Sequence, residues 1–342
     1  MSHQTLELSI DSYFAQVAKL NGVASAVRKF SVVPAVQQTM EKRIQQSSAF
    51  LSAINVIGVN EMQGEKVGLG VSKRITSNTD TSGGGTRTAQ SVHDLDKNNY
   101  LCRKNNFDTA LRYATMDAWV GQPNFQELLR DAILEAQALD RICIGFNGTS
   151  YAATSDSEAN PLLQDVNIGW LQQIRTNAAD RVMDEVVENS GVINVYAGGD
   201  YENLDALVMD AVNNLIHERH IARTDLVAIV NRNMLSDKYF PLVNKDQPNS
   251  EKIAADMIIS QKRLGGLQAM AAPFVPDGTI LITTLDNLSI YWQKNGRRRH
   301  LKDNPERDQI ENYESSNDAY VVEDYTRACL IENINTTAPV AP

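Results

Sequence analysis

The sequence lacks the features of membrane proteins, disulfide-rich proteins and zinc proteins. Its longest apolar runs, such as Asp225–Val230 and Gly278–Ile282, fall far short of the ~20 residues that a transmembrane helix needs. Its 3 cysteines, Cys102, Cys143 and Cys329, include no CxxC pair, so neither a disulfide framework nor a zinc cluster is indicated. We therefore expect that the protein does not contact a membrane. We also expect that it is found in a reducing compartment.

A secretion signal and a strongly basic composition are also missing. Residues Met1–Asp11 mix Gln, Glu and Asp with apolar residues, whereas a signal peptide places a basic segment before an apolar one. The formal net charge of -10 opposes sequence-independent attraction to a polyanion. Any contact with DNA is therefore predicted to be weak or local.

The sequence contains no recognised catalytic or cofactor motif. The glycine-rich stretch Ser82–Thr86 has neither phosphate-loop nor dinucleotide spacing, so we interpret it as a flexible loop tip. His217 and His220 could place two metal ligands on one helix face, but no third ligand is identifiable, which favours a solvated helix end. Cys143 falls on an apolar helical stripe, where cysteine packs as a small hydrophobic residue. We predict that the protein is not an enzyme and holds no metal and no cofactor.

What is present is an ordinary soluble composition in a long chain. The 342 residues are 42% hydrophobic and 22% charged, enough for two packed domains or one domain with large insertions. Residues 6–20 have apolar side chains at helical spacing, and Asn21 and Gly22 follow as a stop. Residues 36–51 form a second helical segment whose sparse apolar face cannot bury much by itself. Both segments are therefore predicted to be arms that need a neighbouring surface.

A long extended loop is predicted after the arms. Residues 54–71 are rich in Val and Ile and are broken by Glu61–Gly64, which indicates two strands joined by a turn. Residues 72–99 are almost wholly polar, and Tyr100–Tyr113 resumes a strand-like pattern. Such a loop would be mobile in an isolated subunit.

The strongest local pattern runs from Asn124 to Phe146. Apolar residues recur there at alternating steps of three and four, which predicts one helix about 35 Å long. The predicted core stripe of this helix consists of Leu129, Ala132, Ala136, Leu139, Cys143 and Phe146.

The second half of the chain alternates helices and strands and then becomes rich in strands. Residues 169–187 are predicted to be helical, Asp200 to cap the following helix, and residues 226–230 to form a compact buried strand. Ser250 is predicted to cap another helix, and residues 267–334 have the pattern of short strands. The predicted class is α+β.

A basic cluster, Arg297–His300, stands directly before the acid-rich stretch Asp303–Glu332. A nucleic-acid surface would extend over a face and interleave aromatic residues, which this short cluster does not do. We therefore predict an ion-paired contact within or between subunits. The candidates for intersubunit contact are Arg297, Arg298, Arg299, Glu323 and Asp324.

Several stretches, in order along nearly the whole chain, carry a family resemblance. They are YFAQVAKLNG (13–22), EMQGEKVGLGV (61–71), GFNG (145–148), NPLLQDV (160–166), GGDYENLDALVMDAVNNLI (198–216), DKYFPLVNK (237–245), residues 249–267, DNLSIY (286–291) and NYESSNDAYVVEDY (312–325). Residues 184–197 match least well. On these stretches the chain resembles the major capsid proteins of P2-type tailed phages.

The resemblance implies the Hong Kong 97-type phage capsid fold, with an N-terminal arm, an extended hairpin loop, and peripheral and axial domains. The implied segments are an arm at 1–53, the loop at 54–113, a peripheral domain at 114–169 and 300–342 with its spine helix at 124–146, and an axial domain at 170–299.

The resemblance also implies a function. Such proteins form pentamers and hexamers that assemble into an icosahedral shell around phage double-stranded DNA, built in the bacterial host cytoplasm and kept in the virion capsid. The implied partners are a scaffolding protein, a maturation protease and a portal protein. The implied processing removes residues 1–30, and we place the cut between Phe30 and Ser31 because a polar stretch follows the predicted helix end near Asn21.

Two alternatives stay open at this point. A cargo-enclosing nanocompartment would use the same fold around an enzyme in place of a genome. An unrecognised enzyme would be built on the segment Gly198–Val230 and would show a small-molecule activity in dissociated subunits, although no site residues are found for it.

Overall fold

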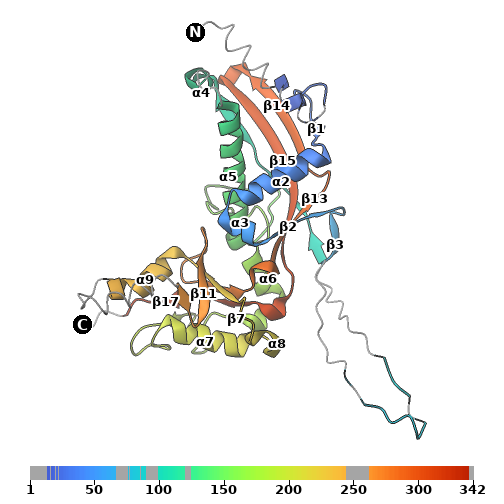
Figure 1. Ribbon diagram of the computed structural model, residues 1–342. Coiled ribbons are helices and arrows are strands. Elements are labelled where there is room, and N and C mark those ends of the chain that lie inside the picture. The colour runs from blue at the N-terminus through green and yellow to red at the C-terminus, as the bar shows by residue number, and fades with distance from the viewer. Residues whose placement is uncertain are drawn as a thin grey trace.

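The computed structural model shows an elongated chain that contains two large sheets (Figure 1). It describes residues 14, 15, 17–19, 21, 23–66, 76, 78–84, 86–89, 99–119, 125–243 and 262–338. One end of the molecule contains two long neighbouring strands beside a long helix, and the other end contains shorter strands among helices. Within the described ranges, no helix combines the length and the apolar character needed to cross a membrane.

The first sheet has seven strands, and helices cover one of its faces. Its order is β1 (Phe30–Ser31), β14 (Arg298–Asn304), β15 (Gln309–Val322), β13 (Leu288–Gln293) and β2 (Asn55–Val59), and β5 (Arg103–Asn106) and β6 (Thr109–Arg112) also pair with β15. The helices of this end are α2 (Pro34–Gln46), α3 (Ala49–Ala53), α4 (Tyr113–Trp119) and α5 (Phe125–Asn147). We call this end the upper body.

The second sheet has six strands and lies at the other end, which we call the lower body. Its order is β10 (Arg263–Leu264), β11 (Leu267–Ala271), β9 (Val227–Val230), β12 (Ile280–Thr283), β16 (Cys329–Ile331) and β7 (Val182–Met183). The other elements here are α6 (Trp170–Asn177), α7 (Leu204–Leu215), α8 (Glu218–Ile221), α9 (Arg232–Val243) and the pair β8 (Ile193–Asn194) and β17 (Ile334–Asn335). All four residues of β9 are buried, which explains its continuous apolar run.

The base of the predicted extended loop is a hairpin, but its strands are not the two that were expected. β3 (Gln63–Glu65) pairs with β4 (Asn99–Leu101), and β2 pairs in parallel with β13. The prediction that residues 54–71 form a hairpin is therefore wrong, because β2 pairs with β13 in the first sheet and β3 pairs with β4. Residues 67–75 and 90–98 lie outside the described residues.

The predicted α+β class is confirmed, and so are most long elements. The helix predicted at 124–146 is α5, and the strand predicted at 226–230 is β9. The helix predicted at 169–187 ends at Asn177, because the chain then forms a short 3-10 turn and enters β7. The helix predicted after Ser250 lies outside the described residues.

The predicted cap of α7 is wrong. Asn203 is the capping residue, and its side chain accepts a hydrogen bond from the Ala206 amide at 2.9 Å. Asp200 instead accepts a hydrogen bond from the Asn194 amide at 2.8 Å and so holds the preceding turn. Sequence pattern alone placed the helix start three residues too early.

The predicted core stripe of α5 is wrong over its first half. Ala132, Ala136 and Leu139 are exposed, whereas Leu134 and Ala138 are buried. The helix is turned so that two polar side chains face the sheet, as described below. Near its end α5 does bury the predicted Cys143 and Phe146, because it enters the core between the two sheets.

The chain passes between the two bodies more than once. β12 belongs to the second sheet and β13 to the first, and the chain returns from β15 to β16 through the 3-10 turn Tyr325–Arg327. The change of sheet therefore does not coincide with residue 300, where the peripheral domain was expected to resume.

Candidate functional site

The most unusual feature of the upper body is a buried network of charged side chains. Arg297 is fully buried and donates from Nε to Glu314 at 2.6 Å and from Nη1 to Glu41 at 2.7 Å. Its third nitrogen, Nη2, donates to the side-chain oxygen of Gln137 at 2.6 Å. The guanidinium therefore connects α2, α5 and β15.

A second buried guanidinium completes the network. Arg141 of α5 is 1% exposed and donates from Nη1 to Glu41 at 2.6 Å. Its Nη2 lies 3.0 Å from an oxygen of Asp318, and Ser316 donates to the other Asp318 oxygen at 2.6 Å. Glu41 thus bridges two arginines that are far apart in the sequence.

The local sequence explains how these side chains meet. Gln137 and Arg141 are four residues apart and share one face of α5. Glu314, Ser316 and Asp318 alternate along β15, so they share the face that is turned toward the helices. The interface between this helix and this strand is consequently polar at its centre.

The network contains three carboxylates and two guanidinium groups. Burial raises the pKa of Glu41 and of Glu314, but the neighbouring guanidinium groups outweigh burial and hold both pKa values below the ordinary range. For Asp318 burial dominates, and its pKa is raised despite Arg141. Burial therefore favours the protonated form of Asp318, whereas the guanidinium groups favour the ionised forms of Glu41 and Glu314.

Arg297 has the ion-paired contact predicted for the basic cluster, and this contact is within the subunit. Its side chain is 0% exposed and donates to Glu314, Glu41 and Gln137 of the same chain. Arg298 is exposed, and Arg299 is half-buried and donates to Asn312 at 2.7 Å. An intersubunit role for the three arginines stays a prediction.

The predicted contacts Glu323 and Asp324 lie at the crossing between the two bodies. Glu323 accepts hydrogen bonds from Ser289 at 2.5 Å and from Tyr291 at 2.8 Å. Asp324 accepts from the Thr326 amide at 2.9 Å and lies 3.7 Å from His220. Both carboxylates therefore have partners within the chain.

Asn287 joins the two crossing segments. It is fully buried, and its Nδ2 donates to the Asp324 carbonyl at 2.9 Å while its Oδ1 accepts from the Asp324 amide at 2.8 Å. The His217 amide donates to the Thr326 carbonyl at 3.1 Å. The two histidines considered as metal ligands thus belong to the contact between α8 and this crossing.

The predicted cleavage point lies in a paired strand. Phe30 and Ser31 form β1, which pairs with Arg299 and Arg298 of β14 at the edge of the first sheet. The next residue, Val32, donates from its amide to the Arg297 carbonyl at 3.1 Å. A protease would need this short strand to separate from β14 before it could bind the extended backbone.

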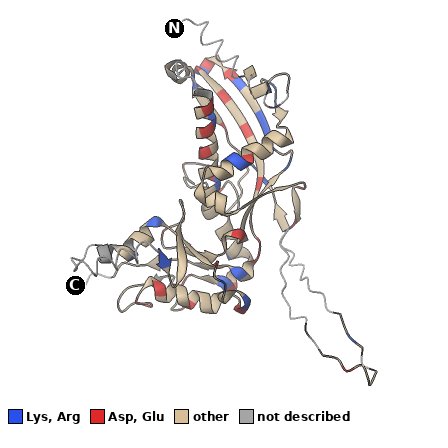
Figure 2. Cartoon of the chain, viewed as in Figure 1, with Lys and Arg blue, Asp and Glu red and all other residues tan. Residues whose placement is uncertain are grey.

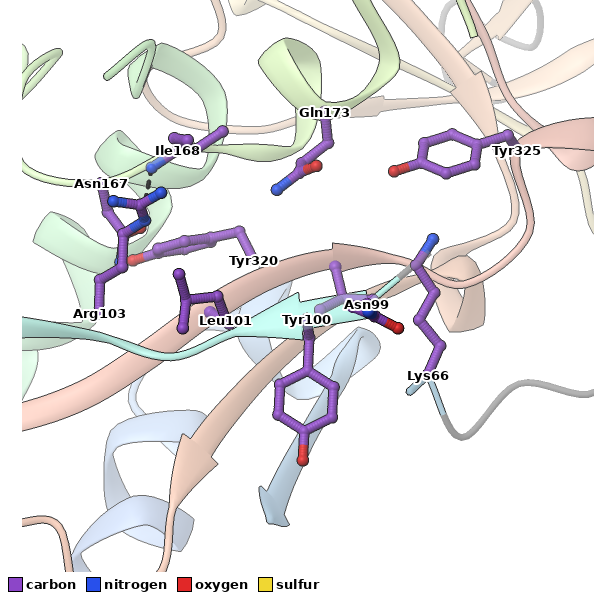
Figure 3. Close-up of a pocket in the computed structure, with 12 residues that line it drawn as sticks. Lys66, Asn99, Tyr100, Leu101, Arg103, Asn167, Ile168, Gln173, Tyr320 and Tyr325 are labelled. Carbon is purple, nitrogen blue, oxygen red and sulfur yellow. Dashed lines mark hydrogen bonds between the residues drawn. The ribbon is translucent and has the colours of Figure 1, made fainter. Parts of the chain in front are cut away.

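A polar cavity of about 190 Å³ lies at the base of the extended loop. Figure 3 shows Lys66 and Tyr325 at one end and Arg103 and Asn167 at the other. The Lys66 ammonium donates to the Val322 carbonyl at 2.6 Å and lies 4.1 Å from the centre of the Tyr325 ring. These contacts attach the loop base to the end of β15.

The three thiols show no sign of nucleophilic activation. Cys102, Cys143 and Cys329 are buried, and burial raises their pKa values to about 12, about 11 and about 12, respectively. The expected packing role of Cys143 agrees with its 5% exposure.

At the glycine-rich loop tip, Ser82 donates from its amide to Asp80 at 2.9 Å, and Gly85 lies outside the described residues.

Sequence reasoning missed Glu41, Gln137, Arg141, Glu314 and Asp318. A partial signal was present, because polar residues recur at steps of four in α5 and at steps of two in β15. That signal does not distinguish a buried polar face from a solvated one.

Comparison with known proteins identifies the family. A model of the P2 family of phage major capsid proteins matches residues 9–334. A capsid protein of Escherichia phage P2 is 49% identical over 338 residues, covering 97% of this chain and 95% of the relative. The major capsid protein of Serratia phage KSP20 is 41% identical and covers 99% of both chains.

A solved structure agrees with these relatives. A chain of the satellite phage P4 procapsid, which includes the size determination protein Sid, has a TM-score of 0.83 and 46% identity over 98% of this chain and 99% of that one. The predicted capsid fold of Hong Kong 97 type is confirmed. The chain belongs to the P2 family of phage major capsid proteins.

Proposed function

We propose that this chain assembles, as pentamers and hexamers, into an icosahedral shell that encloses phage double-stranded DNA. The single observation that carries the proposal is the match to capsid proteins along 97% of the chain, at 49% identity. The fold is consistent with it, since the buried network ties the arm helix α2 to α5 and β15 and so stiffens the subunit.

Scaffolding protein, maturation protease and portal protein are the proposed partners, and assembly is proposed to take place in the host cytoplasm. The cut between Phe30 and Ser31 remains part of this proposal. It is supported by the position of β1, which has only two residues at a sheet edge and can separate without disturbing the rest of the sheet.

The domain roles follow the sheets in this proposal. The lower body, with β9 to β12 and the returning β16, corresponds to the axial domain, and the upper body, with α5 and β13 to β15, to the peripheral domain. The axial domain would then end near residue 287 and not at 299.

We propose a structural role with no catalytic activity and only weak contact with DNA. The net charge of -10 supports the second point, because a shell that bound packaged DNA tightly would impede packaging and ejection. Submicromolar, salt-sensitive binding of duplex DNA by isolated subunits would contradict it.

The decisive experiment is electron microscopy of the chain co-expressed with its scaffold. Closed icosahedral shells are expected, and particles from infected cells should contain nuclease-protected double-stranded DNA. A co-purifying enzyme without DNA would favour a cargo compartment. Intact mass of the mature protein tests the cut, and retention of residues 1–30 would exclude it.

A further inference from the structure

The long helix α5 leaves a stripe of apolar and acidic side chains uncovered. Exposed residues follow two neighbouring rows at steps of four. The rows are Glu127, Asp131, Glu135 and Leu139, and Leu128, Ala132, Ala136 and Asp140. We call these eight residues the acidic stripe, and Figure 2 shows its acids in red along α5. Leu128 is 56% exposed and Leu139 is 38% exposed, although the sequence pattern had assigned Leu139 to the core.

The carboxylates of the acidic stripe are only partly neutralised within the subunit. Asp131 lies 2.8 Å from Arg130 and 3.9 Å from Arg43. In the described part of the chain, no ion pair within 4.0 Å involves Glu127, Glu135 or Asp140. The stripe therefore offers negative charge beside apolar surface, a combination that a cationic partner surface would match.

The opposite face of the same sheet carries such cations. Residues directly opposed in an antiparallel pair project to the same face, so the register of β14, β5 and β6 on β15 shows which side chains share it. The cations on the face turned away from α2 and α5 are all exposed: Lys104, Arg112, Arg298 and Lys302. We call this surface the basic face.

The centre of the basic face is suited to contact with another protein. His300 and Tyr313 stack there with ring centroids 6.0 Å apart, and Tyr313 is 42% exposed. The carboxylate on this face, Glu311, already accepts hydrogen bonds from Tyr313 at 2.6 Å and from Gln309 at 2.9 Å. The face is therefore cationic at its corners and aromatic in the middle.

The two surfaces agree in size. From residue 127 to 140 the stripe is ~20 Å long at ~1.5 Å per helical residue. From the level of Lys104 to that of Arg112 the basic face extends along residues 309–317 of β15, which is ~26 Å at ~3.3 Å per residue. Three strands are ~10 Å wide, close to the ~10–12 Å diameter of a helix.

We infer that the acidic stripe of one copy of this chain lies on the basic face of the next copy. Because the two surfaces are on opposite sides of the upper body, the contact is head-to-tail, and repetition with rotation closes a ring. A two-fold contact centred on the acidic stripe would place acids against acids, and one centred on the basic face would place cations against cations. The inference rests on the proposed pentamers and hexamers and states which surfaces join their subunits.

Charge reversal tests the contact. Arg298→Glu with Lys302→Glu reverses the basic face, and Glu127→Lys with Glu135→Lys reverses the stripe. Each pair is expected to lower the yield of shells, in co-expression with the scaffold, by about tenfold or more, and all four changes together should restore most of it. Glu188→Lys, at an exposed position of the lower body, is the matched control and should leave the yield unchanged.

Three outcomes would overturn the inference. The first is a combined variant that assembles no better than the two reversed pairs. The second is a reversed basic face that forms shells at normal yield but protects less DNA, which would make it a DNA surface. The third is a reversed stripe that forms normal shells without bound scaffold. Failure of the unaltered chain to form shells would count against the proposed function instead.

Cross-linking supplies an independent measurement in shells that have already assembled. Ala136→Cys lies on the stripe and Ala110→Cys on the basic face, and the natural cysteines are buried. With a short bismaleimide, the chain carrying both changes should give a ladder up to five or six subunits, because a head-to-tail contact continues from copy to copy. Each single variant should stay monomeric. Monomers from the double variant, or dimers from a single variant, would overturn the inference.

Discussion

The upper and lower bodies hold their helices to their sheets by different chemistry. In the lower body, Leu207 and Val208 of α7 belong to an apolar cluster that also contains Ala228 and Val230 of β9. In the upper body, α5 meets β15 through polar pairs, with Gln137 3.2 Å from Glu314 and Arg141 3.0 Å from Asp318.

The difference shows which helix–sheet contacts of the subunit tolerate small shifts and which require a defined geometry. Apolar burial depends on area and is nearly independent of direction, so the lower body can absorb small shifts between α7 and its sheet. Buried ion pairs require defined geometry, so the upper body fixes the relative positions of α2, α5 and β15.

The largest expected effect is the removal of one buried charge from the upper body. Arg297→Ala leaves Glu314 and Glu41 without one of their cations in a site that excludes water. We expect the free energy of unfolding, measured by urea denaturation, to fall by about 3–5 kcal/mol.

The neighbouring arginine is the matched control for this prediction. Arg298→Ala changes an exposed side chain next in sequence and should alter the unfolding free energy by no more than about 0.5 kcal/mol. Equal losses for the two variants would show that the buried network does not stabilise the upper body.

The second effect tests the apolar contact of the lower body. Leu207→Ala removes a fully buried side chain of α7 and leaves a cavity against the second sheet. The expected loss of unfolding free energy is about 3 kcal/mol, and Leu207→Met should lose less than about 1.5 kcal/mol because volume is nearly conserved. If the two variants were equally destabilised, cavity formation would not be the cause.

The third effect is the pH dependence that the buried network of the upper body contributes to stability. Because the pKa values of Glu41 and Glu314 are lowered by guanidinium groups, their stabilisation is complete above the ordinary value of 4.5 and is lost as the pH falls through the folded pKa. The raised pKa of Asp318 acts in the opposite sense, since its protonation favours the folded state as the pH falls toward 3.8.

Glu314→Gln should therefore make the fall of unfolding free energy below pH 4.5 shallower, by up to about one proton in the slope. Denaturation curves at several pH values measure this slope. An unaltered slope for Glu314→Gln would mean that this carboxylate is not held ionised by Arg297.

The smallest effect concerns the cap of α7. Asn203→Ala removes the hydrogen bond to the Ala206 amide and should lower the unfolding free energy by about 1 kcal/mol. Asn203→Ser keeps a capping oxygen and should lose only a fraction of that. A larger loss from Asp200→Ala than from Asn203→Ala would restore the cap that the sequence pattern suggested.

The sequence predicted best where structure is decided by neighbours in the chain. α5 was placed within one residue at each end, because a 23-residue helix shows its period many times. The buried strand β9 was predicted because its apolar run is continuous, which is the pattern of a strand buried on both faces. The cap at Asn203 was missed because Asp200, only three residues away, is an equally good capping residue by type.

The sequence predicted least where the partner is distant. β2 pairs with β13, and Glu41 contacts Arg297, which is 256 residues away. The same distance explains why the basic cluster was predicted to make an ion-paired contact either within or between subunits, since nothing local shows that Arg297 is buried while Arg298 is exposed. The buried network around Arg297 was not foreseen, because its members are far apart in the sequence.

By itself the sequence determined the α+β class, the long helix and, through its resemblance, the capsid family. Only the tertiary structure decided how α5 is rotated about its axis, and with it which side chains are buried. The sequence of α5 allows either its apolar stripe or the face with Gln137 and Arg141 to lie against the sheet. In the structure the second face lies there, because Arg141 and Gln137 pair with carboxylates of β15. Because those charges are buried in pairs, the acidic stripe with Ala132, Ala136 and Leu139 faces outward, where we infer that another copy of the chain binds.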